Sequence, residues 1–313
     1  MQHGENTLRL LMEPLQPFLA KPGTTEIVVN KPGELGCECD GAWSWHQVAE
    51  LDFEHLDAMA TLAAVATSQD FGPDNPRCSS VLPGGYRVQI ARPPITANGV
   101  VSITIRKRSS SFVPTLEWLN EHGCFRHLDP AVDWVEWFGS RVRAFKTFLI
   151  GGRTGSGKTS LCEALGRAIP AHERILTIEK TAELVLPHHG WLPQTYGYAG
   201  DGAEADRAAV LLLQDALRQR PDRIILGELR GAGEAWAFLR AIKAGHPGGL
   251  STIHAGSAGG CISALATMMR GDPAATAMED GYIRAEIREH VDVLVHCDRD
   301  PYRVTEVIEI ERC

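Results

Sequence analysis

The chain has 313 residues, of which 44% are hydrophobic and 22% are charged, values typical of a soluble globular protein that buries a sizeable core. Its net charge of −8 argues against a protein whose main task is to coat nucleic acid, because such proteins carry a basic excess. The amino terminus lacks a basic segment followed by an apolar stretch, and no apolar run approaches the length of about 18 residues that spans a membrane. We therefore expect neither a signal peptide nor a transmembrane helix.

The 8 cysteines are spread along the chain, and none falls in a Cys-x-x-Cys pair. Cys37 and Cys39 stand too close together for the usual zinc ribbon. We therefore expect reduced thiols, as in a cytosolic protein.

The first part of the chain reads as a small α+β domain over residues 1–107. Leucines at helical spacing predict one amphipathic helix over residues 1–23, ended by Pro22-Gly23. Alternating stretches broken by turn residues predict hairpins over 25–48. A helix over 52–70 and strands within 83–94 and 99–109 follow.

A second domain is predicted over residues 115–313, after a linker at 108–114. Thr115 is the expected cap of the first helix. Apolar strands then alternate with helices, and this pattern predicts a parallel sheet covered on both faces. The predicted strands are 145–152, 174–180, 221–229 and 249–255.

The strongest motif lies where the first of these strands ends. Gly152, Gly157, Lys158 and Thr159 satisfy G-x-x-x-x-G-K-[ST], between an apolar strand and a helix. In such a loop the backbone N–H groups surround phosphate oxygens, the lysine reaches the β- and γ-phosphates, and the Thr hydroxyl ligates Mg²⁺. The sequence therefore predicts ATP and Mg²⁺ as ligands. Further loop residues expected to contact the nucleotide are Thr154, Gly155, Ser156 and Ser160.

Carboxylates follow two of the other strands. Glu228 stands at the end of strand 221–229, where ligands bind in open α/β sheets, and is the expected partner of Thr159 in holding Mg²⁺, partly through water. Glu179 ends strand 174–180 and is the better candidate for polarising the attacking water. Glu183 is as readily explained as a capping or solvated residue.

Two histidines and an arginine complete the candidate set. His246 and His254 flank strand 249–255, and both are candidate γ-phosphate sensors. A metal site is the weaker interpretation of this pair, because no third ligand is clustered with them. Arg230, two residues after Glu228, is a candidate for a γ-phosphate or intersubunit contact.

The order of these motifs resembles the secretion-superfamily ATPases that serve type II secretion, type IV pili and type IV secretion. Within the first domain, PGGYRVQIARPP and VVSITIRKRS look most like the type IV secretion branch, the VirB-class traffic ATPases. The segments of the second domain that carry the resemblance are the loop at 152–159, TIEKTAEL at 177–184, LRQRPDRIILGELRG at 217–231 and GHPGGLSTIHA at 245–255.

The resemblance implies an α/β fold, with a RecA-like P-loop ATPase domain and a parallel-rich sheet, preceded by the smaller α+β domain. It implies a hexameric ring in which arginines of the first domain, here Arg87 and Arg106, reach nucleotide bound between the domains. The implied activity is Mg²⁺-dependent ATP hydrolysis that powers substrate translocation or pilus biogenesis by a type IV secretion system. The implied location is cytoplasmic, at the inner membrane through other secretion components, without direct sequence-specific binding of nucleic acid.

One departure leaves alternatives open. The family usually has Glu-Asp-Thr where this chain has Glu179-Lys180-Thr181, so a lysine replaces an acid beside the proposed catalytic glutamate. A nucleotide-gated scaffold with little hydrolysis is therefore one alternative. A type IV pilus or type II secretion motor is another, although its usual four-cysteine insertion is missing. A DNA-translocating P-loop enzyme is opposed by the net charge of −8.

Overall fold

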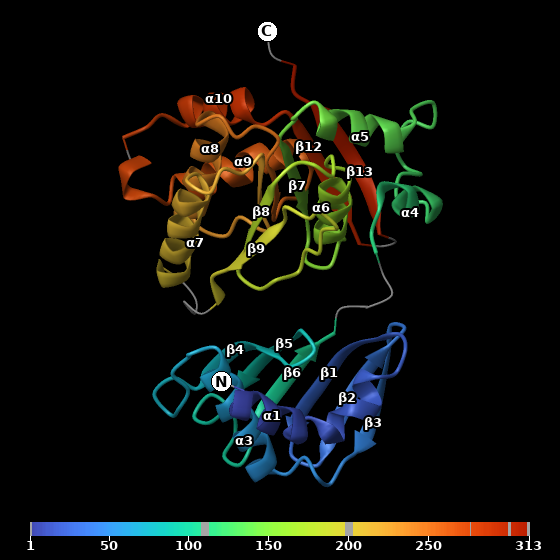
Figure 1. Cartoon of the computed structure of the whole chain (residues 1–313), viewed down its shortest axis with the longest axis vertical. Helices are drawn as coiled ribbons and strands as arrows, with labels where there is room; N and C mark the ends of the chain where they lie inside the picture. Colours follow the sequence, from blue (N-terminus) through green and yellow to red (C-terminus); the bar gives the residue numbers. More distant parts are fainter. Residues whose placement is uncertain (1, 108–112, 198–202, 276, 300–301, 312–313) are drawn as a thin grey trace. The chain divides into compact units, whose positions relative to one another are not determined.

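The computed structural model describes residues 2–107, 113–197, 203–275, 277–299 and 302–311. The chain forms two compact units, Met1–Val113 and Pro114–Cys313, each with its own sheet (Figure 1). Most of the predicted linker, residues 108–112, lies outside the described residues. The first sheet is antiparallel and the second is mainly parallel. This confirms the predicted α/β fold, preceded in the sequence by a smaller α+β part.

The first unit is a six-stranded antiparallel sheet with helices on one face. The strand order is β3-β2-β1-β6-β5-β4. Apolar residues that alternate along the strands pack with α1 and α3 into one core, which includes Ile27, Val29 and Ile103. The elements are α1 (Gln2–Leu11), a 3₁₀ turn η1 (Glu13–Leu15), α2 (Gln16–Leu19), β1 (Thr24–Lys31), β2 (Glu34–Cys39), β3 (Ala42–Gln47), α3 (Phe53–Ala66), β4 (Arg77–Leu82), β5 (Tyr86–Ala91) and β6 (Ser102–Arg106).

The predicted single helix over residues 1–23 is wrong in one respect, because it is broken into three pieces. Pro14 and Pro17 lie in its second half, and each lacks the N–H that a continuous helix needs. The chain therefore passes from α1 through the 3₁₀ turn into α2, while Leu8, Leu15 and Leu19 stay buried.

The second unit is built on a seven-stranded sheet with the order β13-β12-β7-β11-β10-β8-β9. β13 pairs antiparallel with β12, and the other neighbouring strands are parallel. The strands are β7 (Phe148–Gly152), β8 (Ile175–Glu179), β9 (Leu192–Thr195), β10 (Arg223–Leu226), β11 (Leu250–Ile253), β12 (Val293–Asp298) and β13 (Arg303–Glu309).

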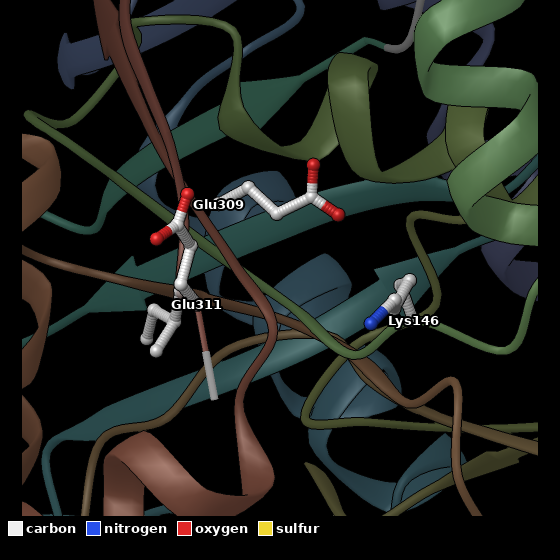
Figure 2. A pocket seen from close by; sticks show the side chains of 4 residues that line it. Lys146, Glu309 and Glu311 are labelled. Atoms are coloured by element: carbon white, nitrogen blue, oxygen red, sulfur yellow. The ribbon is translucent and has the colours of Figure 1, made fainter. Parts of the chain in front are cut away.

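A shallow pocket lies at the edge of this sheet where β7 begins (Figure 2). Two of its charged groups are already paired: Lys146 Nζ lies 3.2 Å from Asp292 Oδ1, and Arg141 Nη2 lies 2.9 Å from Glu309 Oε2. The pocket is thus explained by ion pairs that close the amino edge of the sheet. The residues that line it are Lys146, Glu309, Ile310 and Glu311.

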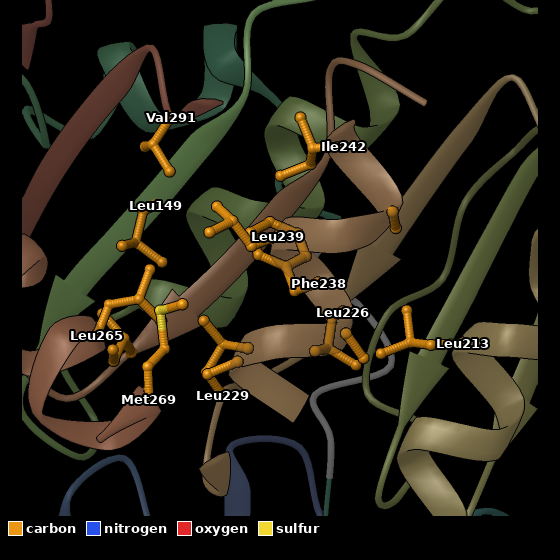
Figure 3. Packing of buried hydrophobic residues seen from close by; sticks show 14 of the residues in the cluster. Leu149, Leu213, Leu226, Leu229, Phe238, Leu239, Ile242, Leu265, Met269 and Val291 are labelled. Carbon is orange, nitrogen blue, oxygen red and sulfur yellow. The ribbon is translucent and has the colours of Figure 1, made fainter. Parts of the chain in front are cut away.

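Helices cover both faces of the second sheet, as the parallel pattern predicts. On one face α7, α8, α9 and α10 bury Leu149 and Leu226 of the sheet (Figure 3). On the other face α4, α5 and α6 bury the alternate residues, such as Phe148 and Ile150. The helices are α4 (Leu116–Glu121), α5 (Trp134–Arg143), α6 (Lys158–Arg167), α7 (Ala203–Ala216), α8 (Ala232–Lys243), α9 (Ala258–Met269), the 3₁₀ turn η3 (Pro273–Ala275) and α10 (Asp280–His290).

Two further expectations concern the described residues as a whole. No helix among them is both long enough and apolar enough to cross a bilayer. All seven cysteines in the described part of the chain are free thiols, as predicted.

Candidate functional site

Four predicted residues meet at one edge of the second sheet because their strands are parallel neighbours. Ile253 of β11 pairs with Gly151 of β7, and Leu226 of β10 pairs with Ile178 of β8. The carboxyl ends of these strands therefore lie side by side, in the order β7, β11, β10, β8. The residues at or just beyond those ends are Gly152, His254, Glu228 and Glu179.

The loop from β7 to α6 depends on its glycines. Gly157 has φ +87°, a left-handed conformation that costs glycine nothing, and it lies directly before the first residue of α6. Gly152 has φ +155°, and a Cβ there would lie 2.4 Å from the carbonyl oxygen of Cys297. Only glycine therefore fits the start of the loop, where the backbone turns closely past β12.

Lys158 lies inside this loop rather than in solvent. Its Nζ donates to the carbonyl oxygens of Gly152 and Arg153, both at 3.0 Å, and the residue is 6% exposed. Burial lowers the pKa of the ammonium group, while the nearby carboxylates of Glu228 and Glu183 raise it. A cation held here, with few water contacts, suits a multiply charged anion.

The remaining loop residues fit a phosphate chain. Ser156 is 2% exposed, and its Oγ has no hydrogen-bond partner among the described residues, so the loop holds a buried polar atom ready for a ligand. Thr159 and Ser160 are half-buried in the first turn of α6, and Thr154 is exposed at the crest of the loop. The amino end of α6 adds a positive dipole to the same place.

Glu228 is held from two sides. Arg230 directs Nε and Nη2 to Glu228 Oε2, at 2.7 and 2.6 Å. His254 Nε2 lies 3.2 Å from Glu228 Oε1. The half-buried Glu228 carboxylate therefore lies between Arg230 and His254. It also lies near Lys158.

Thr159 and Glu228, the two residues predicted to hold Mg²⁺, both carry the side-chain oxygens that this ion prefers, and phosphate and water oxygens would supply the remaining ligands. The described part of the chain contains no group of three or more His, Cys, Asp or Glu that could hold a metal by itself.

Glu179 is buried at the end of β8, with 4% exposure. Its Oε1 accepts the backbone N–H groups of Glu183 and Leu184, at 3.0 and 3.2 Å. A Cβ on Gly227 would lie 2.9 Å from Glu179 Cγ. The glutamate side chain therefore packs against the turn that carries Glu228. The carboxylate thus orders its own following turn and lies against the Glu228 segment.

The structure does not bring His246 to this edge. His246 follows α8 and precedes β11, whereas His254 follows β11. The four residues of β11 alone separate the two histidines by about 13 Å at the usual strand rise. Gly248, in the same turn as His246, packs against Arg223 at the amino edge of the sheet, away from the phosphate loop.

The two predicted arginines of the first unit form a pair. Arg87 of β5 and Arg106 of β6 are direct partners across the antiparallel ladder, so their side chains lie on one face. Arg106 also pairs with Glu26 of β1. This face is opposite the one that packs against α1 and α3, because the intervening strand residues Val88 and Ile105 are buried in the core.

One pair of site residues is missing from the sequence prediction. Glu234, in the first turn of α8, accepts the backbone N–H of Arg230 at 2.7 Å, and Tyr196, which follows β9, donates its hydroxyl to Glu234 at 2.8 Å. A glutamate three residues after the glycine that precedes a helix is a readable capping signal, but Tyr196 has no sequence signal that joins it to Glu234.

The comparisons with known proteins agree with the motifs. The model of the family described as "Type II/IV secretion system protein" matches residues 73–294. The VirB11 type IV secretion system protein of Brucella suis is 37% identical over 305 residues, covering 91% of this chain and 84% of that protein. PtlH of Bordetella pertussis, also a type IV secretion system protein, is 37% identical over 303 residues, covering 92% and 89%.

Solved structures extend the likeness to the fold. The crystal structure of the Brucella suis VirB11 ATPase in complex with sulphate superposes with a TM-score of 0.51 at 35% identity, covering 96% of this chain and 97% of that one. The pilus retraction motor PilT with bound ADP has a TM-score of 0.62 at 18% identity, covering 92% and 77% of the two chains, and shares the fold.

The resemblance that the motifs predict is confirmed by these matches at the level of the family. The matched segment covers most of the chain, and the relatives are covered over more than four fifths of their own length. The chain therefore belongs to the family of type II/IV secretion system proteins.

Proposed function

We propose that this protein is a Mg²⁺-dependent ATPase that powers a type IV secretion system. The observation that carries the proposal is the meeting of the glycine loop with Glu228: Lys158 is buried in the loop with its Nζ on two backbone carbonyl oxygens, and the Glu228 carboxylate lies near it. The printed names of the relatives VirB11 and PtlH supply the secretion context.

Each residue has a defined task in this proposal. Lys158 and the backbone of the loop bind the β- and γ-phosphates, while Thr159 and Glu228 hold the metal, which would neutralise charge on the phosphates. Glu179 orients the attacking water. His254 and Arg230, which both contact Glu228, respond to the γ-phosphate through that carboxylate.

The first unit is proposed to act on the same nucleotide. Arg87 and Arg106 form a paired cationic surface, and such a pair suits the equatorial oxygens of a transferring phosphoryl group. The proposal includes a hexameric ring, a cytoplasmic location and attachment to the inner membrane through other secretion components. Sequence-specific nucleic acid binding is not part of it.

The test replaces Lys158 with Ala and measures ATP turnover of the purified protein. We expect turnover to fall at least a hundredfold, because the buried cation is lost from the phosphate site. Lys243→Ala, a surface change on α8, is the matched control and keeps the parent rate. Unchanged turnover in Lys158→Ala would overturn the proposal.

Lys180 favours one second candidate, a nucleotide-gated scaffold with little hydrolysis. Single-turnover hydrolysis compared with nucleotide affinity separates the two functions. Brisk turnover at high affinity excludes the scaffold, whereas tight binding without turnover excludes the motor.

A further inference from the structure

A chain of hydrogen bonds begins at two buried residues that the sequence analysis does not include, Tyr196 and Glu234, and leads to the candidate site. Tyr196 Oη donates to Glu234 Oε1 at 2.8 Å, and both residues are 2% exposed. Glu234 Oε2 accepts the backbone N–H groups of Arg230 at 2.7 Å and Gly231 at 3.2 Å. The side chain of Arg230 then binds Glu228.

The two ends of this chain reach Glu179 and Glu228, the first through its backbone and the second through its carboxylate. The backbone N–H of Tyr196 donates to the carbonyl oxygen of Glu179 at 3.1 Å, so Tyr196 is fixed to the end of β8. Its hydroxyl, through Glu234 and Arg230, connects to Glu228 at the end of β10. One tyrosine therefore joins the two strand ends that carry Glu179 and Glu228.

The position of Glu234 is itself closely determined. Asp206 of α7 accepts the backbone N–H groups of Gly233 and Glu234, at 3.2 and 3.0 Å, and caps the start of α8. Glu234 then satisfies two more N–H groups just before the helix. Burial raises the pKa of Glu234, and the hydrogen bonds from Arg230, Tyr196 and Gly231 lower it. Removing any one of these donors leaves the buried Glu234 carboxylate with a missing hydrogen bond, which is costly in a site of low dielectric.

We propose that Tyr196 and Glu234 are positioning residues for hydrolysis, which set the backbone of Arg230 so that its guanidinium holds Glu228 in register with Glu179. This inference rests on the proposed ATPase function and adds two residues that touch neither nucleotide nor metal. This positioning of Glu228 affects hydrolysis more than nucleotide binding, because phosphoryl transfer is sensitive to the placement of the catalytic carboxylates.

The test is Tyr196→Phe, which removes only the hydroxyl. The matched control is Thr177→Val, because Thr177 Oγ1 accepts a hydrogen bond at 3.0 Å from Trp191, which lies at the other end of β9. Both variants lose one hydrogen bond from an aromatic donor, but only the first touches the chain to Glu228. A general loss of stability therefore affects both.

We expect kcat of Tyr196→Phe to fall about tenfold, the effect of roughly 1.4 kcal/mol, while its affinity for a fluorescent ATP analogue stays within about twofold of the parent. In the protein without nucleotide, amide hydrogen exchange at Arg230 and Gly231 becomes faster. Thr177→Val changes neither quantity. A kcat within twofold of the parent, or an equal loss in the control, overturns the inference while leaving the ATPase function intact.

Variants of Glu234 provide an independent test if the Tyr196→Phe protein folds poorly. Glu234→Gln keeps an oxygen for the two N–H groups and is expected to retain most of kcat, whereas Glu234→Ala loses about tenfold or more. Glu234→Ala combined with Tyr196→Phe is expected to be no slower than Glu234→Ala alone, since the two act in series. Losses that multiply in the double variant would show that the residues act separately and would overturn the inference.

Discussion

The amino ends of the two carboxylate-bearing strands are joined by a buried ion pair whose loss should be costly. Arg223, the first residue of β10, is fully buried, and its Nε lies 2.6 Å from Oε2 of Glu173, just before β8. Arg223 Nη2 also donates to the carbonyl oxygen of Val142 at 2.8 Å, and its guanidinium lies 3.7 Å from the ring centre of Phe145. The buried guanidinium is therefore held by an ion pair, a backbone carbonyl and an aromatic ring.

The size of the loss follows from this burial. Glu173→Gln leaves the Arg223 charge in a site without water, and breaking a buried pair in this way costs about 3–5 kcal/mol. For a domain of this size, each kcal/mol lowers the melting temperature by about 2–4 °C. We therefore expect the melting transition of the second unit, followed by circular dichroism, to fall by about 6–20 °C.

A double variant distinguishes the destabilisation caused by the unpaired Arg223 charge from the destabilisation caused by lost packing. Replacing both Arg223 and Glu173 with Met removes the charge and keeps most of the volume, so it should melt higher than Glu173→Gln. At 20 °C the Glu173→Gln protein should still bind nucleotide, because the pair lies at the edge of the sheet opposite the phosphate loop. A melting temperature within about 2 °C of the parent in Glu173→Gln would refute the reasoning.

Three further predictions concern single positions. Gly152→Ala should weaken nucleotide affinity at least tenfold in a fluorescence titration, because its Cβ would lie 2.4 Å from a backbone oxygen; parent affinity would contradict the close fit of the loop against β12. Gly227→Ala should lower kcat without changing affinity, since its Cβ would lie 2.9 Å from Glu179 Cγ and displace that side chain; equal losses in both would contradict it. Iodoacetamide at pH 8 should label half-buried Cys39 before Cys78, because burial raises the pKa of Cys78 to about 11 and leaves almost no reactive thiolate at pH 8; mass spectrometry reads the order, and early labelling of Cys78 would refute it.

The order of strands and helices could be predicted from the sequence where the apolar periodicity was strong. The hairpins predicted over 25–48 form at 24–47, and the strands that lead to Glu179 and Glu228 also form, because turn residues and apolar runs mark them clearly. The strand Arg77–Leu82 is absent from the prediction, since Ser79 and Ser80 interrupt its apolar pattern. No strand is predicted after residue 255, yet β12 and β13 form there and complete the sheet beside the phosphate loop.

Contacts between segments were harder to predict than the segments. His246 and His254 stand in one short motif, but the predicted strand between them already separates them, and β11 places them at opposite edges of the sheet. The sequence analysis proposes a γ-phosphate or an intersubunit contact for Arg230, and it does not include the contact with Glu228, two residues earlier, that the structure shows. Tyr196 reaches Glu234 across 38 positions of sequence, and no local pattern encodes such a contact.

Sheet order, rather than sequence order, decides which groups can cooperate at the site. β11 is the last of the four site strands in sequence, but it lies between β7 and β10. His254 is therefore placed between the phosphate loop and Glu228, where its Nε2 approaches one carboxylate oxygen while Arg230 binds the other. A carboxylate with both oxygens engaged can respond only if one donor changes its partner. If Lys158 binds the γ-phosphate as we propose, that anion would compete with Glu228 for His254 or Arg230.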